Sequence, residues 1–239
     1  MLAHAFAASI FRPIALACEV MASRPKPADP RPAPRLYLVT PPVADAQAFS
    51  AMLSAAMAAG DVAAVLLCLT EADERTQINR AKLIGPAVQN KGAALLLGGH
   101  ADLVARAGAD GAHVTGITAL TEAVAQLKPE RIAGAGGLTT RHDAMIAAEA
   151  GADYVMFGEP GADGERPGLE AIEERIAWWA EVFEIPCVGY AASTEEIAPL
   201  VIAGADFIAL GDWIWRDPQT AAAAIAHAAE HLHVPETAL

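Results

Sequence analysis

Three segments of the chain share the pattern Ala-Gly-Ala-Asp followed by an apolar run: AGADGAHVTG begins at Ala107, AGADYVMFGE at Ala150 and AGADFIALGD at Ala203. Each copy follows an alanine-rich, helix-like segment and precedes a short run typical of a strand. We expect the glycine to end the helix in the left-handed conformation and the aspartate to hydrogen-bond locally in the turn. A looser copy, AAGDVAAVLL, places Gly60 and Asp61 at the corresponding positions. The repeated unit is therefore a helix-to-strand junction, and such junctions constrain the fold.

Strands and helices alternate strictly from Arg35 onward. Apolar runs of about 4–8 residues indicate buried strands, and longer alanine-rich amphipathic stretches indicate helices. The expected strands are residues 35–40, 62–69, 93–97, 111–114, 131–135, 153–158, 185–190 and 206–211. The expected helices lie near 43–59, 73–91, 99–107, 118–127, 139–150, 168–183, 193–203 and 217–233.

These strands are apolar at consecutive positions, so both of their faces are buried and helices must surround a parallel sheet. Eight such units in about 200 residues predict an α/β protein, a single (β/α)8 TIM barrel. The Gly-Asp junctions precede every second strand, as expected of a barrel whose core layers come from alternate strands. An open doubly wound sheet is the alternative, but the turn VTPPVADA lacks the GxGxxG pattern that such sheets usually carry after their first strand.

The composition and net charge of the chain limit the kinds of partner that we expect it to bind. With 54% apolar and 19% charged residues among 239, the chain favours one large buried core. The net charge of −13 argues against a nucleic-acid partner or an anionic membrane surface, so a small molecule is the expected ligand. The three cysteines, Cys18, Cys68 and Cys187, show no spacing typical of disulfides or zinc sites, which fits a cytoplasmic location.

Residues 1–34 differ from the predicted barrel of residues 35–239. An apolar stretch broken by Arg12, Pro13 and Glu19 leads into the proline-rich linker SRPKPADPRPAPR. Apolar runs this short cannot span a bilayer. The N-terminal arm could be a docking helix, a signal peptide, or residues upstream of a true start at Met21.

Four segments occur in an order that resembles one known family: RLYLVT, LLGGHADLVARAGADGAHVTG, GADYVMFGEP and AGADFIALGDWIW. Over about residues 35–215 the chain is similar to the thiamine phosphate synthase family, which includes related thiazole tautomerases. The strongest matches, at residues 102–103, 108–113, 151–154 and 204–206, are mainly scaffold positions. The resemblance implies a barrel of thiamine metabolism whose ligand site lies at the carboxyl ends of the strands.

Synthases of this family join a pyrimidine pyrophosphate to a thiazole phosphate and use Mg²⁺ with cationic side chains. Here Leu66, Cys68 and Thr70 occupy the positions of the family's Gln, Arg and Lys, and the magnesium-ligand positions are Gly99 and Thr118. The resemblance therefore predicts that the pyrophosphate machinery is lost, with no metal cofactor and no magnesium-dependent synthase activity.

The family's Ser and His after the fifth strand are also absent, because the aligned positions here are Gly137 and Thr139. The family's phosphate-binding turns fall on VGYA (188–191) and LGDWI (210–214), where Gly189 is kept, Tyr190 replaces a glycine and Asp212 replaces a serine. A carboxylate in an anion cup costs about 1–4 kcal/mol, unless it turns outward to cap its helix. The expected ligand-binding residues are His113, Thr139, Gly189, Tyr190, Gly211, Asp212 and Trp213.

His100 replaces a family arginine and is the candidate acid or base; its alternative is a solvated residue of a first helical turn. His113 is either a core histidine or a pocket residue. The loop at 158–168 could be a mobile lid with Arg166 as its cation, or a featureless surface loop. We expect Trp178, Trp179, Trp213 and Trp215 to pack helices onto the barrel; exposed members of this set would instead mark the interface of a homodimer.

Three functions follow as hypotheses. The first is an enzyme or former enzyme of thiamine metabolism. The second is a non-catalytic binding or regulatory barrel that recognises a neutral or cationic heterocycle, with Tyr190 and Trp213 stacking on it and Asp212 or Glu159 pairing with its charge. The third is unrelated chemistry on the same scaffold.

Overall fold

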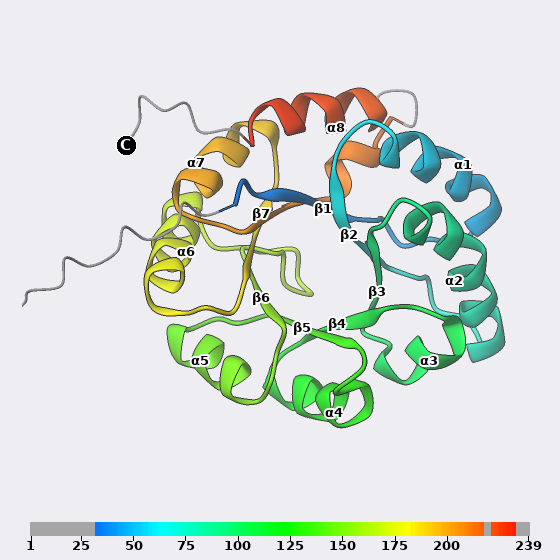
Figure 1. Cartoon of the computed structure of the whole chain (residues 1–239), viewed down its shortest axis with the longest axis horizontal. Coiled ribbons are helices and arrows are strands. Elements are labelled where there is room, and N and C mark those ends of the chain that lie inside the picture. The colour runs from blue at the N-terminus through cyan, green and yellow to red at the C-terminus, as the bar shows by residue number, and fades with distance from the viewer. Residues whose placement is uncertain (1–31, 218–220, 233–239) are drawn as a thin grey trace, which may run out of the picture. The chain divides into compact units, whose positions relative to one another are not determined.

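The computed structural model of the chain describes residues 32–217 and 221–232, so the predicted arm lies almost wholly outside the described residues. The strands are β1 (Arg35–Val39), β2 (Val62–Leu67), β3 (Ala94–Gly98), β4 (Gly111–Thr115), β5 (Ile132–Gly136), β6 (Tyr154–Phe157), β7 (Cys187–Ala191) and β8 (Phe207–Leu210). All pairs are parallel, and β8 closes on β1, so the strands form a barrel in chain order (Figure 1). The (β/α)8 barrel is confirmed, and the open sheet is excluded.

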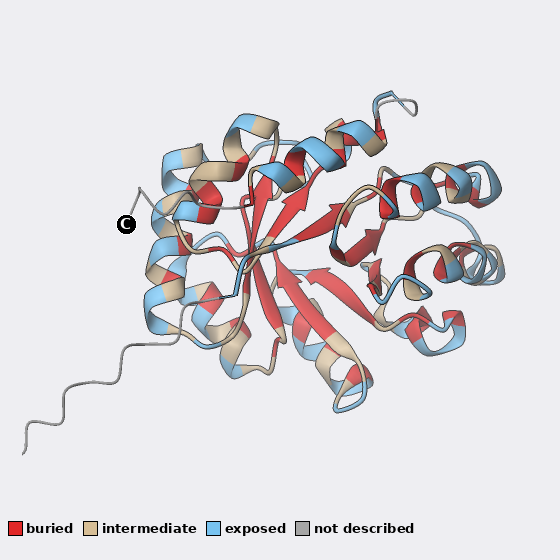
Figure 2. Cartoon of the chain, turned by 45° about the horizontal axis from the view of Figure 1, so that its top comes forward, coloured by how far each residue is buried: buried red, intermediate tan, exposed pale blue. Residues whose placement is uncertain are grey.

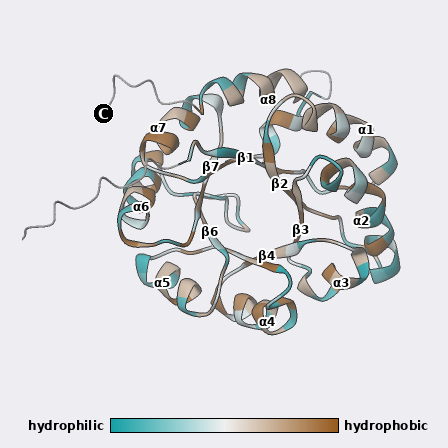
Figure 3. Cartoon of the chain, in the orientation of Figure 1, coloured by the Kyte–Doolittle hydropathy of each residue, from teal (hydrophilic) through white to brown (hydrophobic). Residues whose placement is uncertain are grey.

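Helices surround the barrel. They are α1 (Ala46–Met57), α2 (Glu74–Gln89), α3 (Val104–Ala107), α4 (Ile117–Leu127), α5 (Arg141–Glu149), α6 (Leu169–Val182), α7 (Ile197–Ile202) and α8 (Ala221–Glu230), with short 3-10 turns η1 (Ala101–Leu103), η2 (Thr194–Glu196) and η3 (Asp212–Trp215). The strands are buried, whereas each helix keeps an exposed outer face (Figure 2). Hydrophilic residues accordingly gather on outer helical turns, among them those of α2 (Figure 3). None of the described helices is both long and apolar enough to cross a membrane.

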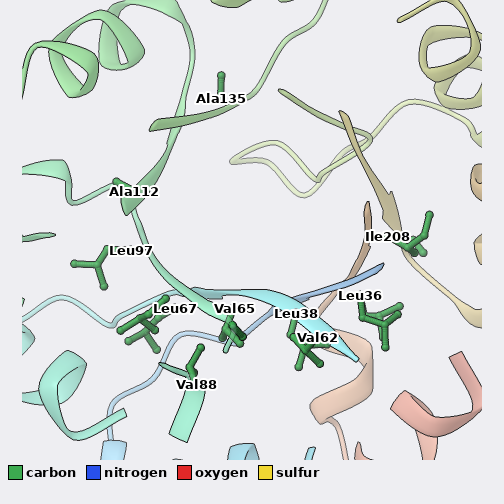
Figure 4. Packing of buried hydrophobic residues seen from close by; sticks show 14 of the residues in the cluster. Leu36, Leu38, Val62, Val65, Leu67, Val88, Leu97, Ala112, Ala135 and Ile208 are labelled. Atoms are coloured by element: carbon green, nitrogen blue, oxygen red, sulfur yellow. The ribbon is translucent and has the colours of Figure 1, made fainter. Parts of the chain in front are cut away.

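Two hydrophobic layers follow from the two-residue period of each strand. Leu36 and Leu38 face the helices, and their neighbour Tyr37 faces the barrel interior. Figure 4 shows part of the outer layer, which lies between strands and helices. The inner layer consists of Tyr37, Ala64, Leu66, Leu96, Tyr154, Met156, Val188, Tyr190 and Ala209.

The junction glycines behave as expected in the three close copies. Gly108, Gly151 and Gly204 have φ angles of 73°, 98° and 99°, in the left-handed region where a side chain would be strained. Gly60 of the looser copy is not among the glycines with positive φ. A Cβ there would lie 3.0 Å from Cγ2 of Ile225, so this glycine permits close packing and does not serve as a left-handed cap.

The sequence pattern predicts that the junction aspartates hydrogen-bond locally in the turn. Their carboxylates instead bond to the neighbouring strand. Each carboxylate accepts a hydrogen bond from one backbone N–H of that strand, and the backbone N–H of the aspartate donates to the carbonyl of the same residue. The pairs are Asp110 with Leu95, Asp153 with Ala133 and Asp206 with Cys187, at carboxylate distances of 2.7, 2.7 and 2.8 Å and carbonyl distances of 2.8, 2.8 and 3.0 Å. The repeated motif therefore joins β4 to β3, β6 to β5 and β8 to β7.

Candidate functional site at the carboxyl end of the barrel

A cavity of about 870 Å³ lies at the carboxyl ends of β4, β5 and β6, under the loop that follows β6. Figure 1 shows this loop, residues 158–168, reaching toward the middle of the ring of strands. The cavity is lined by Thr115, Leu138, Thr139, Met156, Glu159, Asp163, Glu165, Arg166 and Arg175, with glycines and prolines of the loop. It lies at the end of the barrel where ligands of this fold bind.

A chain of hydrogen bonds runs from this cavity into the barrel interior. Glu159 Oε2 lies 3.0 Å from His113 Nε2, and His113 Nδ1 lies 2.9 Å from the Tyr154 hydroxyl. The Tyr154 hydroxyl lies 2.8 Å from that of Tyr37. The other carboxylate oxygen, Oε1 of Glu159, accepts a hydrogen bond from the backbone N–H of Gly137. His113 is only 5% exposed and Glu159 18%, so the carboxylate is the end of the chain that meets the cavity.

The direction of this chain follows from its ends. Burial raises the pKa of Tyr154 and raises that of Tyr37 well above its ordinary value, so both phenols keep their protons. An ionised Glu159 only accepts, which assigns the hydrogen of a neutral His113 to Nε2. Tyr154 then donates to Nδ1 of His113, and Tyr37 donates to Tyr154. Every member is satisfied, in agreement with the absence of unpartnered buried side-chain polar atoms among the described residues.

Two glycines of β5 provide the space for this chain. A Cβ on Gly134 would overlap the ring of Tyr154, and a Cβ on Gly136 would overlap Glu159 Oε1 and approach His113 Nε2 to 2.5 Å. Gly98 of β3 is different, because a Cβ there would make ordinary contacts, the nearest at 3.5 Å from Cys68 Sγ. The position of the Glu159–His113 pair thus depends on Gly136.

The segments expected to form a phosphate cup carry a large side chain. Tyr190 is 6% exposed and packs within the inner layer of the barrel. A Cβ on Gly211 would overlap its hydroxyl, which also interacts with the backbone of Asp212. Burial, and then the charge of Asp212, raise the pKa of Tyr190. Gly189 lies within β7, where a Cβ would meet Ile176 of α6 at 3.0 Å. The space between the two turns is therefore largely filled by Tyr190.

Asp212 and Trp213 lie at this rim but are held differently. Asp212 is exposed and is the first residue of η3. Trp213 is half-buried, and its indole N–H donates to the carbonyl of Ala191 at 2.9 Å. Asp212 thus meets solvent close to Tyr190, and Trp213 is fixed against β7.

The other predicted site residues lie apart from one another. His100 precedes η1, half-buried, with its Nε2 at 3.3 Å from Nε2 of Gln77 on α2. Thr139 lines the cavity but donates to Asp143 Oδ2 at 3.0 Å, at the start of α5. Of the predicted residues, the structure brings His113 and Thr139 to the cavity region, whereas His100 contacts α2.

The loop over the cavity is tied down by its arginine. Arg166 donates to both carboxylate oxygens of Glu196 at 2.9 Å, to the carbonyl of Gly158 at 3.0 Å and to the carbonyl of Tyr190 at 3.1 Å. Its guanidinium lies 5.8 Å from the centre of the Tyr190 ring. Arg166 therefore holds the loop on the barrel and is already paired with a carboxylate.

The residues present do not fit the magnesium site that the resemblance implies. Gly99 has no side chain and a φ of 75°, and Thr118 is exposed on α4. Cys68, at the position of a family arginine, supplies no cation, and burial and then the charge of Glu159 raise the pKa of its thiol to about 11. Among residues 32–217 and 221–232, no three His, Cys, Asp or Glu side chains gather into a potential metal site.

Sequence reasoning named Glu159 only as a charge partner for a ligand and missed Tyr37 and Tyr154. Their common signal is position: each tyrosine occupies an inward-facing place on its strand, as His113 does. Gly134 and Gly136, small residues at inward-facing places on β5, complete the pattern. Only the register of the closed barrel shows that these side chains meet the glycines.

Comparisons with known proteins agree with this architecture. The thiamine monophosphate synthase family model matches residues 36–214. A thiamine-phosphate synthase of Rhodospirillum centenum is 43% identical over 195 residues, which cover 80% of this chain and 94% of that protein. One of Hyphomonas neptunium is 38% identical over 206 residues, covering 83% and 93%. The solved structure of thiamine phosphate pyrophosphorylase from Pyrococcus furiosus superposes with a TM-score of 0.69 at 19% identity, covering 83% of this chain and 95% of that one.

Proposed function

Because this chain belongs to the thiamine monophosphate synthase family, we propose that it acts in thiamine metabolism by binding a thiazole- or pyrimidine-type heterocycle at the carboxyl end of its barrel, without a magnesium-pyrophosphate step. The observation that carries the proposal is the buried Tyr190 side chain, which fills the space beside Gly211 where the resemblance implies a phosphate. A bound phosphate would have to occupy that space in order to reach the backbone N–H donors of the turn.

The charges of the cavity support the same conclusion. Arg166 is paired with Glu196, and Arg175 donates to the backbone carbonyls of Leu138 and Thr139 at 2.9 and 3.0 Å. Glu159 and Glu165 line the cavity. With its cations engaged and carboxylates nearby, the cavity suits a neutral or cationic ring better than a pyrophosphate.

A second candidate is the magnesium-dependent synthase reaction itself. It is favoured by the 43% identity to a relative that carries the synthase name. In the third, the barrel binds its ligand without turnover and acts as a regulator; the loop fastened by Arg166 favours this candidate.

Calorimetric titration of the full chain tests these alternatives. The ligands are thiazole phosphate and pyrimidine pyrophosphate, each with and without Mg²⁺, and thiamine, and pyrophosphate release is followed in parallel. We expect binding of a heterocycle that does not depend on Mg²⁺. Magnesium-dependent affinity for the pyrophosphate, with pyrophosphate release, would contradict the proposal and establish the synthase reaction. Tight binding without turnover would favour the regulator.

Replacing Tyr190 by glycine tests the observation that carries the proposal. Tyr190→Gly should raise the affinity for thiazole phosphate because it opens the filled turn, and Tyr190→Phe is the matched control that keeps the ring. Unfolding midpoints of both variants show whether the barrel remains folded.

A further inference from the structure

We propose that Glu159, positioned by His113, is a proton-exchanging carboxylate that binds the amidine edge of a planar nitrogen base, meaning a protonatable ring nitrogen beside an exocyclic amine. The inference rests on the proposed function for the location of the ligand, in the cavity under the loop 158–168. It assigns to this cavity a reacting group that the resemblance does not supply.

The carboxylate of Glu159 is fixed and still has acceptor capacity. His113 donates to Oε2 at 3.0 Å and the Gly137 N–H donates to Oε1. One donor on each oxygen sets the plane of the group, and each oxygen keeps a second lone pair. Because Glu159 lines the cavity, these lone pairs can meet two adjacent N–H donors of one ligand edge, the bidentate geometry that carboxylates favour. A thiazole, with a single ring nitrogen, cannot offer such an edge.

The hydrogen-bonded chain behind Glu159 determines where the exchanged proton resides. If Nδ1 of His113 donated to the Tyr154 oxygen, one of the two tyrosine hydroxyl hydrogens would face no acceptor found among the described residues. The arrangement that satisfies every member has the Tyr154 hydroxyl donating to Nδ1 and His113 donating to Glu159 through Nε2. The proton passes from the ring nitrogen of the ligand to a Glu159 oxygen, giving a neutral base and a carboxylic acid, and the reverse step restores both.

The surroundings of Glu159 favour a cationic ligand edge. Inside the barrel, burial and, to a smaller extent, the charge of Glu159 raise the pKa values of Cys68, Tyr37 and Tyr154. These groups therefore remain protonated. From the loop and α6, the charged groups that line the cavity are Asp163, Glu165, Arg166 and Arg175. Both arginines are engaged elsewhere, Arg166 with Glu196 and Arg175 with backbone carbonyls. Glu159 thus lacks an arginine partner and is available to a cationic base.

The test uses 4-aminopyrimidine, a fragment that carries the amidine edge and nothing else of a thiamine precursor. Its binding to the full chain is measured by calorimetry at neutral pH, in buffers of different ionisation enthalpy, so that proton uptake is counted. We expect binding with net proton uptake, and weaker binding of unsubstituted pyrimidine. Glu159→Gln should abolish the uptake and weaken binding on the order of tenfold or more, because a hydrogen bond to a charged group is lost.

Matched variants separate positioning from stability. Gly136→Ala keeps every charge but displaces Glu159, so proton uptake should fall as in Glu159→Gln. Gly98→Ala, at an inward-facing position of β3, has room for its methyl group and should bind as the wild type does. His113→Leu should shift the pH profile of binding, and His113→Gln, which retains an N–H donor, should restore part of it.

Each result decides between the two proposals. If thiamine precursors bind but no proton is taken up, or Glu159→Gln leaves the uptake unchanged, the role of Glu159 is refuted and the proposed function stands. If 4-aminopyrimidine binds with Glu159-dependent uptake while no thiamine precursor binds, the proposed function fails and the amidine site stands. Absence of all binding overturns both.

Discussion

At the residue scale, three large side chains inside this barrel each pack against a glycine. Tyr154 lies against Gly134, Glu159 against Gly136, and Tyr190 against Gly211. In a close-packed interior, a large side chain fits inside the barrel only where the neighbouring strand or turn has no Cβ in its way. At these three places, the carboxyl half of the barrel is therefore filled by side chains that the neighbouring glycines accommodate.

The Gly211–Tyr190 pair can be tested by adding one methyl group. Gly211→Ala should lower the free energy of unfolding by about 1–3 kcal/mol, because the new Cβ overlaps the Tyr190 hydroxyl and the core must shift. Chemical denaturation measures the difference, with Gly98→Ala as the control that has space. Equal stability of the two variants would show that Tyr190 does not fill this turn.

The thiol of Cys68 provides a second test at this scale. Burial and then the charge of Glu159 raise the pKa of this thiol from its ordinary value of 9.0 to about 11. At pH 9.0, Cys68 should therefore hold roughly fiftyfold less thiolate than an unperturbed thiol. Alkylation of the Cys68 peptide by iodoacetamide, followed by mass spectrometry, reports this difference. Glu159→Gln should increase the alkylation rate by removing the negative charge, and a rate unchanged by that substitution would place Glu159 away from Cys68.

At the scale of the element, the repeated Ala-Gly-Ala-Asp junction has two separate functions. The glycine ends a helix in the left-handed conformation. The aspartate hydrogen-bonds to the backbone near the beginning of the preceding strand in the barrel. Since each aspartate contacts the N–H and the C=O of one residue, it fixes the register of a strand pair. The looser copy at Asp61 lacks this contact, and its carboxylate pairs with Arg35 at 2.8 Å.

Asp206 is the simplest junction to test because its carboxylate accepts from the Cys187 N–H at 2.8 Å. Asp206→Ala should cost about 1–3 kcal/mol of unfolding free energy, because that N–H is left without its acceptor. Asp206→Asn keeps an acceptor oxygen and should recover most of the loss. Thermal or denaturant unfolding of the two variants measures this; an alanine variant as stable as the asparagine variant would mean that the contact does not hold the strands together.

At the scale of the whole molecule, stability at high pH depends on the barrel interior. The chain has 3 tyrosines, and all belong to the inner layer, at positions 37, 154 and 190. Burial raises the pKa of each above the ordinary value of 10.0. A group whose folded-state pKa is raised contributes stability that is present in full below the pKa of the unfolded chain and is lost as pH rises toward the folded value.

We therefore expect alkaline unfolding above about pH 10, with phenolate absorbance appearing together with the loss of far-ultraviolet circular dichroism. Tyr37→Phe removes one titrating phenol and should make stability less steeply dependent on pH in that range. Phenolate absorbance that appears while the dichroism is still native would contradict the burial of these hydroxyls.

The expected homodimer stays a prediction. Trp179 is fully buried, and Trp178 is half-buried with Arg141 5.0 Å above its ring. Both tryptophans pack with Phe183 at the end of α6. These side chains pack the end of α6 within the chain, and sedimentation of the full chain measures the oligomeric state.

The sequence by itself determined the fold, because its signals are local. Strand length, helical periodicity and left-handed glycines act within a few residues, and closure into eight units follows from their number. Identification of the family likewise rested on scaffold segments, which are contiguous. The residues at positions 66, 68 and 70 are also read without coordinates, and the loss of the family's polar ligands that they imply stays a prediction.

Only the tertiary structure decided the site. Tyr37, His113, Tyr154 and Glu159 are separated by tens of residues, and their contacts exist only because the barrel closes with one particular register. A shift of one residue would turn each inward side chain toward the helices. His100, a convincing candidate on sequence, contacts α2, whereas Glu159 becomes the group that meets the cavity because Gly136 leaves it room.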